Sequence, residues 1–146
     1  MNYIIAAHHI WDKKAYDNLV KSNPSDNFYF ISHKKDLKQK LLNDLNPRYI
    51  FFPHWSHIVP KNFIDDYECV CFHMTDLPYG RGGSPLQNLI LRKHKETKIS
   101  ALRMVNELDA GPIYFKRSLS LNGNAQKIYS SCSKKIFKMI ESLIKK

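Results

Sequence analysis

Residues that could perform acid–base chemistry gather in one segment of this chain, between positions 71 and 113. His73 ends an apolar run, and Asp109 follows 36 positions later, just before Gly111 and Pro112. An imidazole and a carboxylate can share and move protons near neutral pH, so the two residues form a candidate catalytic pair. Each also has an ordinary structural interpretation, because a histidine can be a satisfied polar residue at a strand end and an aspartate readily forms turns.

Cysteine offers one further candidate for chemistry. The chain has three cysteines, and this odd number argues against a disulfide framework. Cys69 and Cys71 stand two positions apart, and no second cysteine pair completes a zinc site. We therefore expect no metal centre, and we keep Cys71 as a candidate because it lies two positions before His73.

Strands and helices alternate along the chain, and they predict the frame that must position these residues. Apolar runs and helical spacing predict strands at 2–7, 27–32, 48–53, 67–73, 97–105 and 112–121, and helices at 11–21, 34–44, 85–93 and 124–144. This alternation predicts a single α/β domain over residues 1–146, Rossmann-like, with a mostly parallel twisted sheet and helices on both faces. Ligands of such sheets bind beyond the carboxyl ends of the strands, which is where His73 falls.

The motifs of residues 71–113 resemble the catalytic core of the folate-dependent formyltransferases. The run from His73 to Pro85 reads HMTDLPYGRGGSP, and the run from Leu108 to Ile113 reads LDAGPI. The family pattern is an Asn-x-His, a Ser-Leu-Leu-Pro, an Arg-Gly, a proline that opens a helix, a Thr-Gly strand and a Leu-Asp-x-Gly. Glu96-Thr97 stands where that strand is expected, and Asp76-Leu77-Pro78 departs from Ser-Leu-Leu-Pro. Several elements in the same order, with a similar separation of the histidine and the aspartate, make this resemblance specific.

The resemblance implies that an amine attacks the formyl carbon of 10-formyltetrahydrofolate and that a tetrahedral oxyanion forms. His73 would stabilise the oxyanion, and Asp109 would support the imidazolium charge and accept the amine proton. Cys71 departs from the family, because it occupies the position of the asparagine whose amide donates to the formyl oxygen. A thiol donates weakly, so three alternatives are open: another group supplies the bond, Cys71 lies inward as core, or Cys71 is a nucleophile.

Two more segments have predicted roles through the resemblance. The loop after His73 would line the amine-substrate side, or would merely connect to the next helix; its candidate substrate-binding residues are Leu77, Tyr79, Arg81, Gly82, Gly83 and Ser84. Arg81 precedes a helix N-terminus and could contact a phosphate. The stretch after the third strand resembles the part of the family that holds the folate pteridine. The candidate cofactor-binding residues, which could alternatively be core, are Trp55, Ile58, Val59 and Leu108.

The net charge of +10 admits a nucleic-acid surface. Much of the lysine, however, lies in helical stretches where it forms solvated faces, and a positive field also attracts folates and nucleotide-sugars. We therefore expect no nucleic-acid partner. No apolar run approaches the roughly 20 residues that cross a bilayer, and the start does not read as a signal peptide, so we expect a cytoplasmic protein without a membrane partner.

The amine that we expect is a nucleotide-linked amino sugar of surface-glycan biosynthesis. Methionyl-tRNA formyltransferases carry a C-terminal barrel, whereas this chain ends one helix after the core, and the loop after His73 resembles short formyltransferases of pseudaminic-acid-type pathways. The alternatives are formylation of another amine, hydrolysis of 10-formyltetrahydrofolate, a silent folate- or nucleotide-binding relative indicated by Cys71, and a basic RNA-binding module. The last helix or strand could also form a homodimer.

Overall fold

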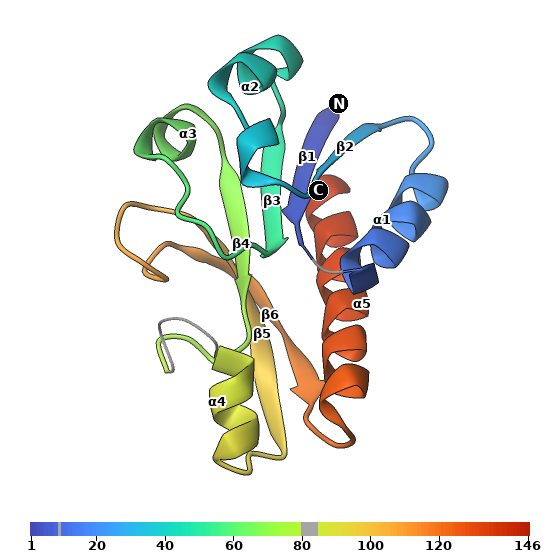
Figure 1. Cartoon of the computed structure of the whole chain (residues 1–146), viewed down its shortest axis with the longest axis vertical. Coiled ribbons are helices and arrows are strands. Elements are labelled where there is room, and N and C mark those ends of the chain that lie inside the picture. Colours follow the sequence, from blue (N-terminus) through green and yellow to red (C-terminus); the bar gives the residue numbers. More distant parts are fainter. Residues whose placement is uncertain (9, 80–84) are drawn as a thin grey trace.

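The computed structural model describes residues 1–8, 10–79 and 85–146, which build one six-stranded sheet with helices packed against it (Figure 1). The strands lie in the order β2-β1-β3-β4-β5-β6. Their bounds are β1 (Asn2–Ala7), β2 (Asn27–Ile31), β3 (Tyr49–His54), β4 (Cys69–His73), β5 (Glu96–Arg103) and β6 (Ile113–Ser120). All six predicted strands are present, with small shifts at their ends.

The pairing of neighbouring strands changes from parallel to antiparallel at β5. Strands β1 to β4 pair in parallel, whereas β5 runs antiparallel to β4 and β6 runs antiparallel to β5. The predicted Rossmann-like, mostly parallel α/β fold is thereby confirmed. In the antiparallel part, His73 faces Ser100 and Ser100 faces Lys116, so the three residues form one row across β4, β5 and β6. Directly opposed residues of antiparallel strands project their side chains to the same face.

Helices cover both faces of the sheet, as the sequence predicts. They are α1 (Ile10–Ser22), the 3-10 turn η1 (Lys34–Asp36), α2 (Gln39–Leu45), α3 (Lys61–Asp66), α4 (Pro85–Leu91) and α5 (Ala125–Ile144). Helices α1 and α5 share one core with the sheet, and α2 and α3 share the other. Within the described residues, no helix is both long and apolar enough to cross a membrane.

Alternate residues of the strands β1, β3 and β4 pack into the two different cores. In β4, Val70 and Phe72 belong to the α1–α5 core, whereas Cys69 belongs to the α2–α3 core. Successive side chains of a strand point to opposite faces, so Cys69, Cys71 and His73 share a face. His73 therefore ends β4 on the α2–α3 side of the sheet.

The segment between β2 and β4 differs from its prediction. The expected helix at 34–44 is divided, because the chain is extended at Lys38 between η1 and α2. This break lets Leu37 enter the α2–α3 core, where its side chain is 8% exposed. Helix α3 was not predicted; it begins directly after Pro60 and buries Phe63. Both features are short, and packing rather than a long periodic pattern determines them.

Candidate active site

His73 and Asp109 come together at the carboxyl edge of the sheet. His73 is the last residue of β4, and Asp109 lies in the turn that joins β5 to β6. His73 Nδ1 lies 3.5 Å from Asp109 Oδ2, and the two side chains are only 8% and 9% exposed. A carboxylate at Nδ1 favours the tautomer that carries its proton there and leaves Nε2 for a reacting group. The arrangement can therefore hold a charged imidazole and move a proton.

The shape of the β5–β6 turn places Asp109 over the end of β4. Asp109 has a φ of 53°, in the left-handed region that aspartate tolerates better than most residues. Gly111 is required because a Cβ atom there would lie 1.7 Å from the carbonyl oxygen of Arg103. The chain then closes on itself through the Arg103 amide, which donates to the Pro112 carbonyl at 2.9 Å. The Leu-Asp-x-Gly sequence thus forms a tight turn that directs the Asp109 carboxylate toward His73.

Cys71 lies beside this pair with a neutral thiol. It packs against the α2–α3 core, on the face of β4 that it shares with His73. Burial, followed by the charges of Asp109 and Cys69, raises the pKa of the Cys71 thiol to about 12. Only the thiolate is a good nucleophile. Among the three alternatives, these observations favour a thiol that lies inward beside the pair over a nucleophile.

The predicted cofactor residues divide into two groups. Val59 is 7% exposed and packs in the α2–α3 core, so its side chain is structural. Ile58 and Leu108 are 91% and 68% exposed, and both remain available to a ligand. Trp55 is half-buried and stacks on His8, with ring centroids 4.3 Å apart and an interplanar angle of 10°. The sequence predicts that the segments with His8 and Trp55 end at the same edge of a parallel sheet, but it assigns no role to His8 and does not predict the stacking.

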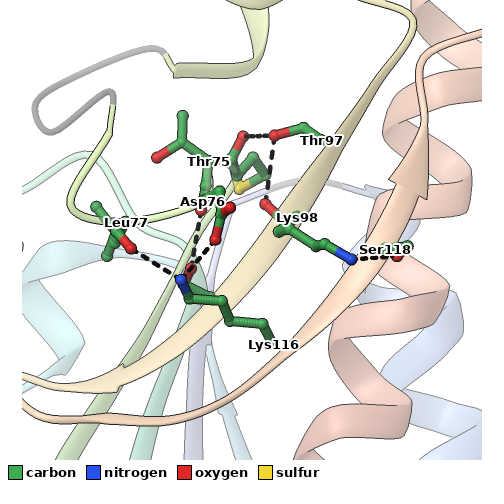
Figure 2. Close-up of polar contacts among 9 residues, drawn as sticks. Thr75, Asp76, Leu77, Thr97, Lys98, Lys116 and Ser118 are labelled. Atoms are coloured by element: carbon green, nitrogen blue, oxygen red, sulfur yellow. Dashed lines mark hydrogen bonds and ion pairs between the residues drawn. The ribbon is translucent and has the colours of Figure 1, made fainter.

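The loop after His73 is fastened to the β5–β6 hairpin by polar side chains, of which the sequence indicated only Thr97, through the family motif (Figure 2). Thr97 donates to the Met74 carbonyl at 3.1 Å, and the buried Ser100 donates to the Thr75 carbonyl at 2.8 Å. Lys116 contacts the next two residues of the loop, the Asp76 carboxylate and the Leu77 carbonyl. No sequence signal identifies Ser100 and Lys116, because polar side chains on a hairpin do not indicate which loop crosses them.

Two of the predicted substrate residues can be placed. Leu77 is 4% exposed and anchors the loop, whereas Tyr79 is 51% exposed, and its ring centroid lies 6.3 Å from that of His94. The predictions for Arg81, Gly82, Gly83 and Ser84 fall outside the described residues. Leu77 thus supports the loop from within, and Tyr79 is the described residue of this set that can meet a ligand.

The opposite edge of the sheet carries a separate polar cluster. Arg48 donates to Glu68 at 2.8 Å, and Tyr114 donates to the other carboxylate oxygen of Glu68. Burial raises the pKa of Glu68, but the hydrogen bonds from Tyr114 and Arg48, together with the charges of Arg48 and Arg103, outweigh it, and the net shift is downward. A cavity of about 440 Å³ lies there, with both Arg48 and Glu68 in its lining. It contains none of the predicted site residues, so the candidate site is at the carboxyl edge alone.

Among residues 1–8, 10–79 and 85–146, no set of three histidine, cysteine, aspartate or glutamate side chains comes close enough together to hold a metal ion. Acid–base chemistry is open to the described site through His73 and Asp109, whose side chains lie together.

Known proteins share both the sequence and the fold. The formyl transferase family model matches residues 14–135. A methionyl-tRNA formyltransferase of Campylobacter jejuni subsp. doylei is 35% identical over 103 residues, which are 70% of this chain and 33% of that protein. The solved structure named methionyl-tRNA formyltransferase from Clostridium thermocellum is 48% identical with a TM-score of 0.95, over 99% of this chain and 65% of that one.

A third comparison concerns the fold alone. The formyltransferase PseJ from Anoxybacillus kamchatkensis has a TM-score of 0.69 at 17% identity, over 93% of this chain and 73% of that one. This chain therefore spans about two thirds of the Clostridium chain and one third of the Campylobacter relative. The family match covers most of the chain and includes both members of the buried pair. The chain belongs to the formyl transferase family.

Proposed function

We propose that this protein transfers a formyl group from 10-formyltetrahydrofolate to the amine of a small substrate. The observation that carries the proposal is the buried contact between His73 and Asp109, 3.5 Å long, at the edge of the sheet where ligands of this fold class bind. A buried carboxylate beside an imidazole suits a reaction in which negative charge develops on oxygen and an amine loses a proton.

In the proposed reaction, the substrate amine forms a bond to the formyl carbon, and the bond from that carbon to the folate nitrogen breaks. 10-Formyltetrahydrofolate supplies the activated formyl group when bound. His73 donates to the developing oxyanion from Nε2, and Asp109 balances the imidazolium charge from the Nδ1 side. Asp109 also receives the amine proton, directly or through water, and this proton is returned to the folate nitrogen, which leaves as the N–H of tetrahydrofolate. The neutral thiol of Cys71 leaves the oxyanion with a weaker donor than an amide.

The surroundings of the pair fit a flat, partly apolar formyl donor. Trp55 lies beyond the end of β3 and Leu108 adjoins Asp109, and their apolar groups remain partly or largely exposed. Such exposed apolar side chains beside a polar site are typical of ligand pockets. The PseJ structure, whose fold this chain shares, contains tetrahydrofolate. These observations support a folate donor at this edge.

For the amine, we propose a nucleotide-linked amino sugar. The strong positive charge of the chain would attract such an anionic substrate. The PseJ structure contains a UDP-linked formamido sugar, which supports the proposal at the level of the fold. A second candidate is methionyl-tRNA, because the relatives that are 35% and 48% identical carry that name.

Parallel assays distinguish these amines. The protein would be incubated with 10-formyltetrahydrofolate and either a UDP-linked 4-amino sugar or methionyl-tRNA, and the formylated product detected by mass spectrometry. We expect formylation of the amino sugar. Product with methionyl-tRNA alone would establish the second candidate, and formate released without any amine would indicate hydrolysis. Folate binding without turnover on a panel of amines would contradict the enzyme and indicate a silent relative.

A further inference from the structure

Lys116 of β6 holds the loop that follows His73. Its Nζ lies 2.8 Å from the Leu77 carbonyl oxygen and 2.5 Å from Asp76 Oδ1. Figure 2 shows the side chain reaching from the hairpin to both groups. An ammonium has three donors, so these two contacts use most of its capacity on adjacent residues of one loop.

The position of Lys116 follows from the register of the sheet. His73 faces Ser100, and Ser100 faces Lys116, in one row on one face. The loop folds back over this row, so that Ser100 meets Thr75 and Lys116 meets the two residues after it. The row thus links the catalytic histidine to successive points of the loop that leaves it.

The contact of Lys116 with the loop differs from an ordinary surface ion pair, which contributes little to stability. The Asp76 side chain is 60% exposed, but that of Lys116 is 31% exposed, and Lys116 also bonds a main-chain carbonyl. A hydrogen bond to the main chain restrains the path of the loop directly, whereas a bond to the Asp76 side chain restrains it only through that side chain. Leu77, buried beside it, ties that path to the core.

We propose that Lys116 is a positioning residue for the amine substrate. It fixes the described part of the loop, residues 74–79, and thereby the place where Tyr79 meets the amine substrate. This inference rests on the proposed formyl transfer. Lys116 touches neither reacting group in the reaction described above, so its loss should weaken binding of the amine more than it slows the chemical step.

The hairpin offers a matched control for this test. Lys98 lies on the same face of the β5–β6 pair, but its Nζ donates to Ser118 Oγ at 2.8 Å and holds the two strands together instead of the loop. Lys98→Met therefore removes a lysine from the same surface without touching residues 74–79. Lys116→Arg keeps a cation in place, and Asp76→Asn removes the ion pair but leaves the bond to the Leu77 carbonyl.

The experiment measures kcat, KM for the amine and the dissociation constant of a folate analogue for the full chain, for Lys116→Met and for these three variants. For Lys116→Met we expect KM for the amine to rise about tenfold or more, because a charged hydrogen bond is worth roughly that factor. We expect kcat and folate affinity to change less than about threefold. Lys116→Arg should restore most of the loss, Asp76→Asn should be intermediate, and Lys98→Met should resemble the wild type.

Amide hydrogen exchange separates this inference from the proposed function. The Leu77 amide donates to Thr75 and the Tyr79 amide to Asp76, so both report on the loop without any substrate. Lys116→Met should lose protection at these amides, and Lys98→Met should keep it. Unchanged exchange in Lys116→Met, an unchanged KM, or an equal effect of Lys98→Met would overturn the role of Lys116. A wild type that formylates no amine would instead contradict the proposed function.

Discussion

Asp109 Oδ2 reaches His73 Nδ1 at 3.5 Å, although 36 positions of the chain separate the two residues. One strand, β5, bridges that distance, because its second half pairs with β4 and the turn that follows it carries Asp109 back toward His73. The candidate catalytic pair therefore depends on the antiparallel part of the sheet.

Removal of either member of the pair should abolish most formyl transfer. We expect His73→Ala to lower kcat about 10²- to 10³-fold through loss of an oxyanion donor. Asp109→Asn should lower it about 10²- to 10⁴-fold through loss of proton transfer. Single-turnover assays would measure both. His33→Ala, a change at an exposed histidine in the loop after β2, is the control. Full activity in either pair variant would show that the pair is not catalytic.

Replacement of Cys71 tests the oxyanion site. Cys71→Asn restores an amide donor beside His73, and we expect a kcat at least equal to that of the wild type and up to about a hundredfold higher. Cys71→Ala, which supplies no donor, should not exceed the wild type. Steady-state kinetics with the same amine compare the three proteins. A complete loss of activity in Cys71→Asn would indicate a dedicated role for the thiol.

The raised thiol pKa predicts slow alkylation. The pKa of Cys71 is about 12 in the folded protein, whereas an unfolded cysteine has a pKa of about 8.5. At pH 8, iodoacetamide should therefore label Cys71 in the unfolded chain much faster than in the folded one, as peptide mass spectrometry can measure. Rapid labelling of the native protein at that pH would contradict a neutral thiol.

The raised pKa of Cys71 also makes the stability of the fold depend on pH. The folded state holds the Cys71 proton more tightly than the unfolded state, so the contribution of the protonated thiol to the free energy of unfolding is complete below about pH 8.5. It declines as the pH rises from there toward about 12. Cys69, whose pKa burial also raises to about 12, adds to this loss. Urea unfolding between pH 7 and pH 10 should show a lower midpoint at the alkaline end, and Cys71→Ala should reduce the slope.

Gly111→Ala should damage both the fold and the site. The new Cβ would lie 1.7 Å from a main-chain oxygen of Arg103, so the turn itself must move. We expect a loss of about 1–3 kcal/mol in the free energy of unfolding, measured by urea denaturation. Because Asp109 shares the turn, kcat should also fall while the protein is still fully folded. Ala110→Ser, at an exposed neighbour, is the control. Wild-type stability and activity in Gly111→Ala would contradict this account of the turn.

Much of the fold was predictable from local patterns. Apolar runs identify the strands, and the periodic apolar residues of 124–144 identify α5, whose N-cap Asn124 accepts from the Lys127 amide at 2.8 Å. Helix α3 was not predicted, because it is short and lies between two apolar elements. The change from parallel to antiparallel pairing at β5 is likewise not visible in a strand's own sequence, because pairing direction depends on how the connections return.

The site was predictable where a motif carries it. His73 and Asp109 stand in runs with specific spacing, and the structure brings them into contact. Ser100 and Lys116 could not be found in the same way, because their partners include main-chain carbonyls of a distant loop. A carbonyl is the same group in every residue, so such a contact leaves no recognisable residue type at its other end.

The row of His73, Ser100 and Lys116 limits which changes of length this protein can tolerate. A residue inserted into or deleted from the middle of β5 would turn Ser100 to the opposite face and shift the strand against both neighbours. The loop support and the approach of Asp109 would then be lost together. Insertions beyond the paired residues, at the end of the hairpin that adjoins α4, would leave the row intact. Variation in length among working versions of this domain should therefore concentrate there and avoid β5.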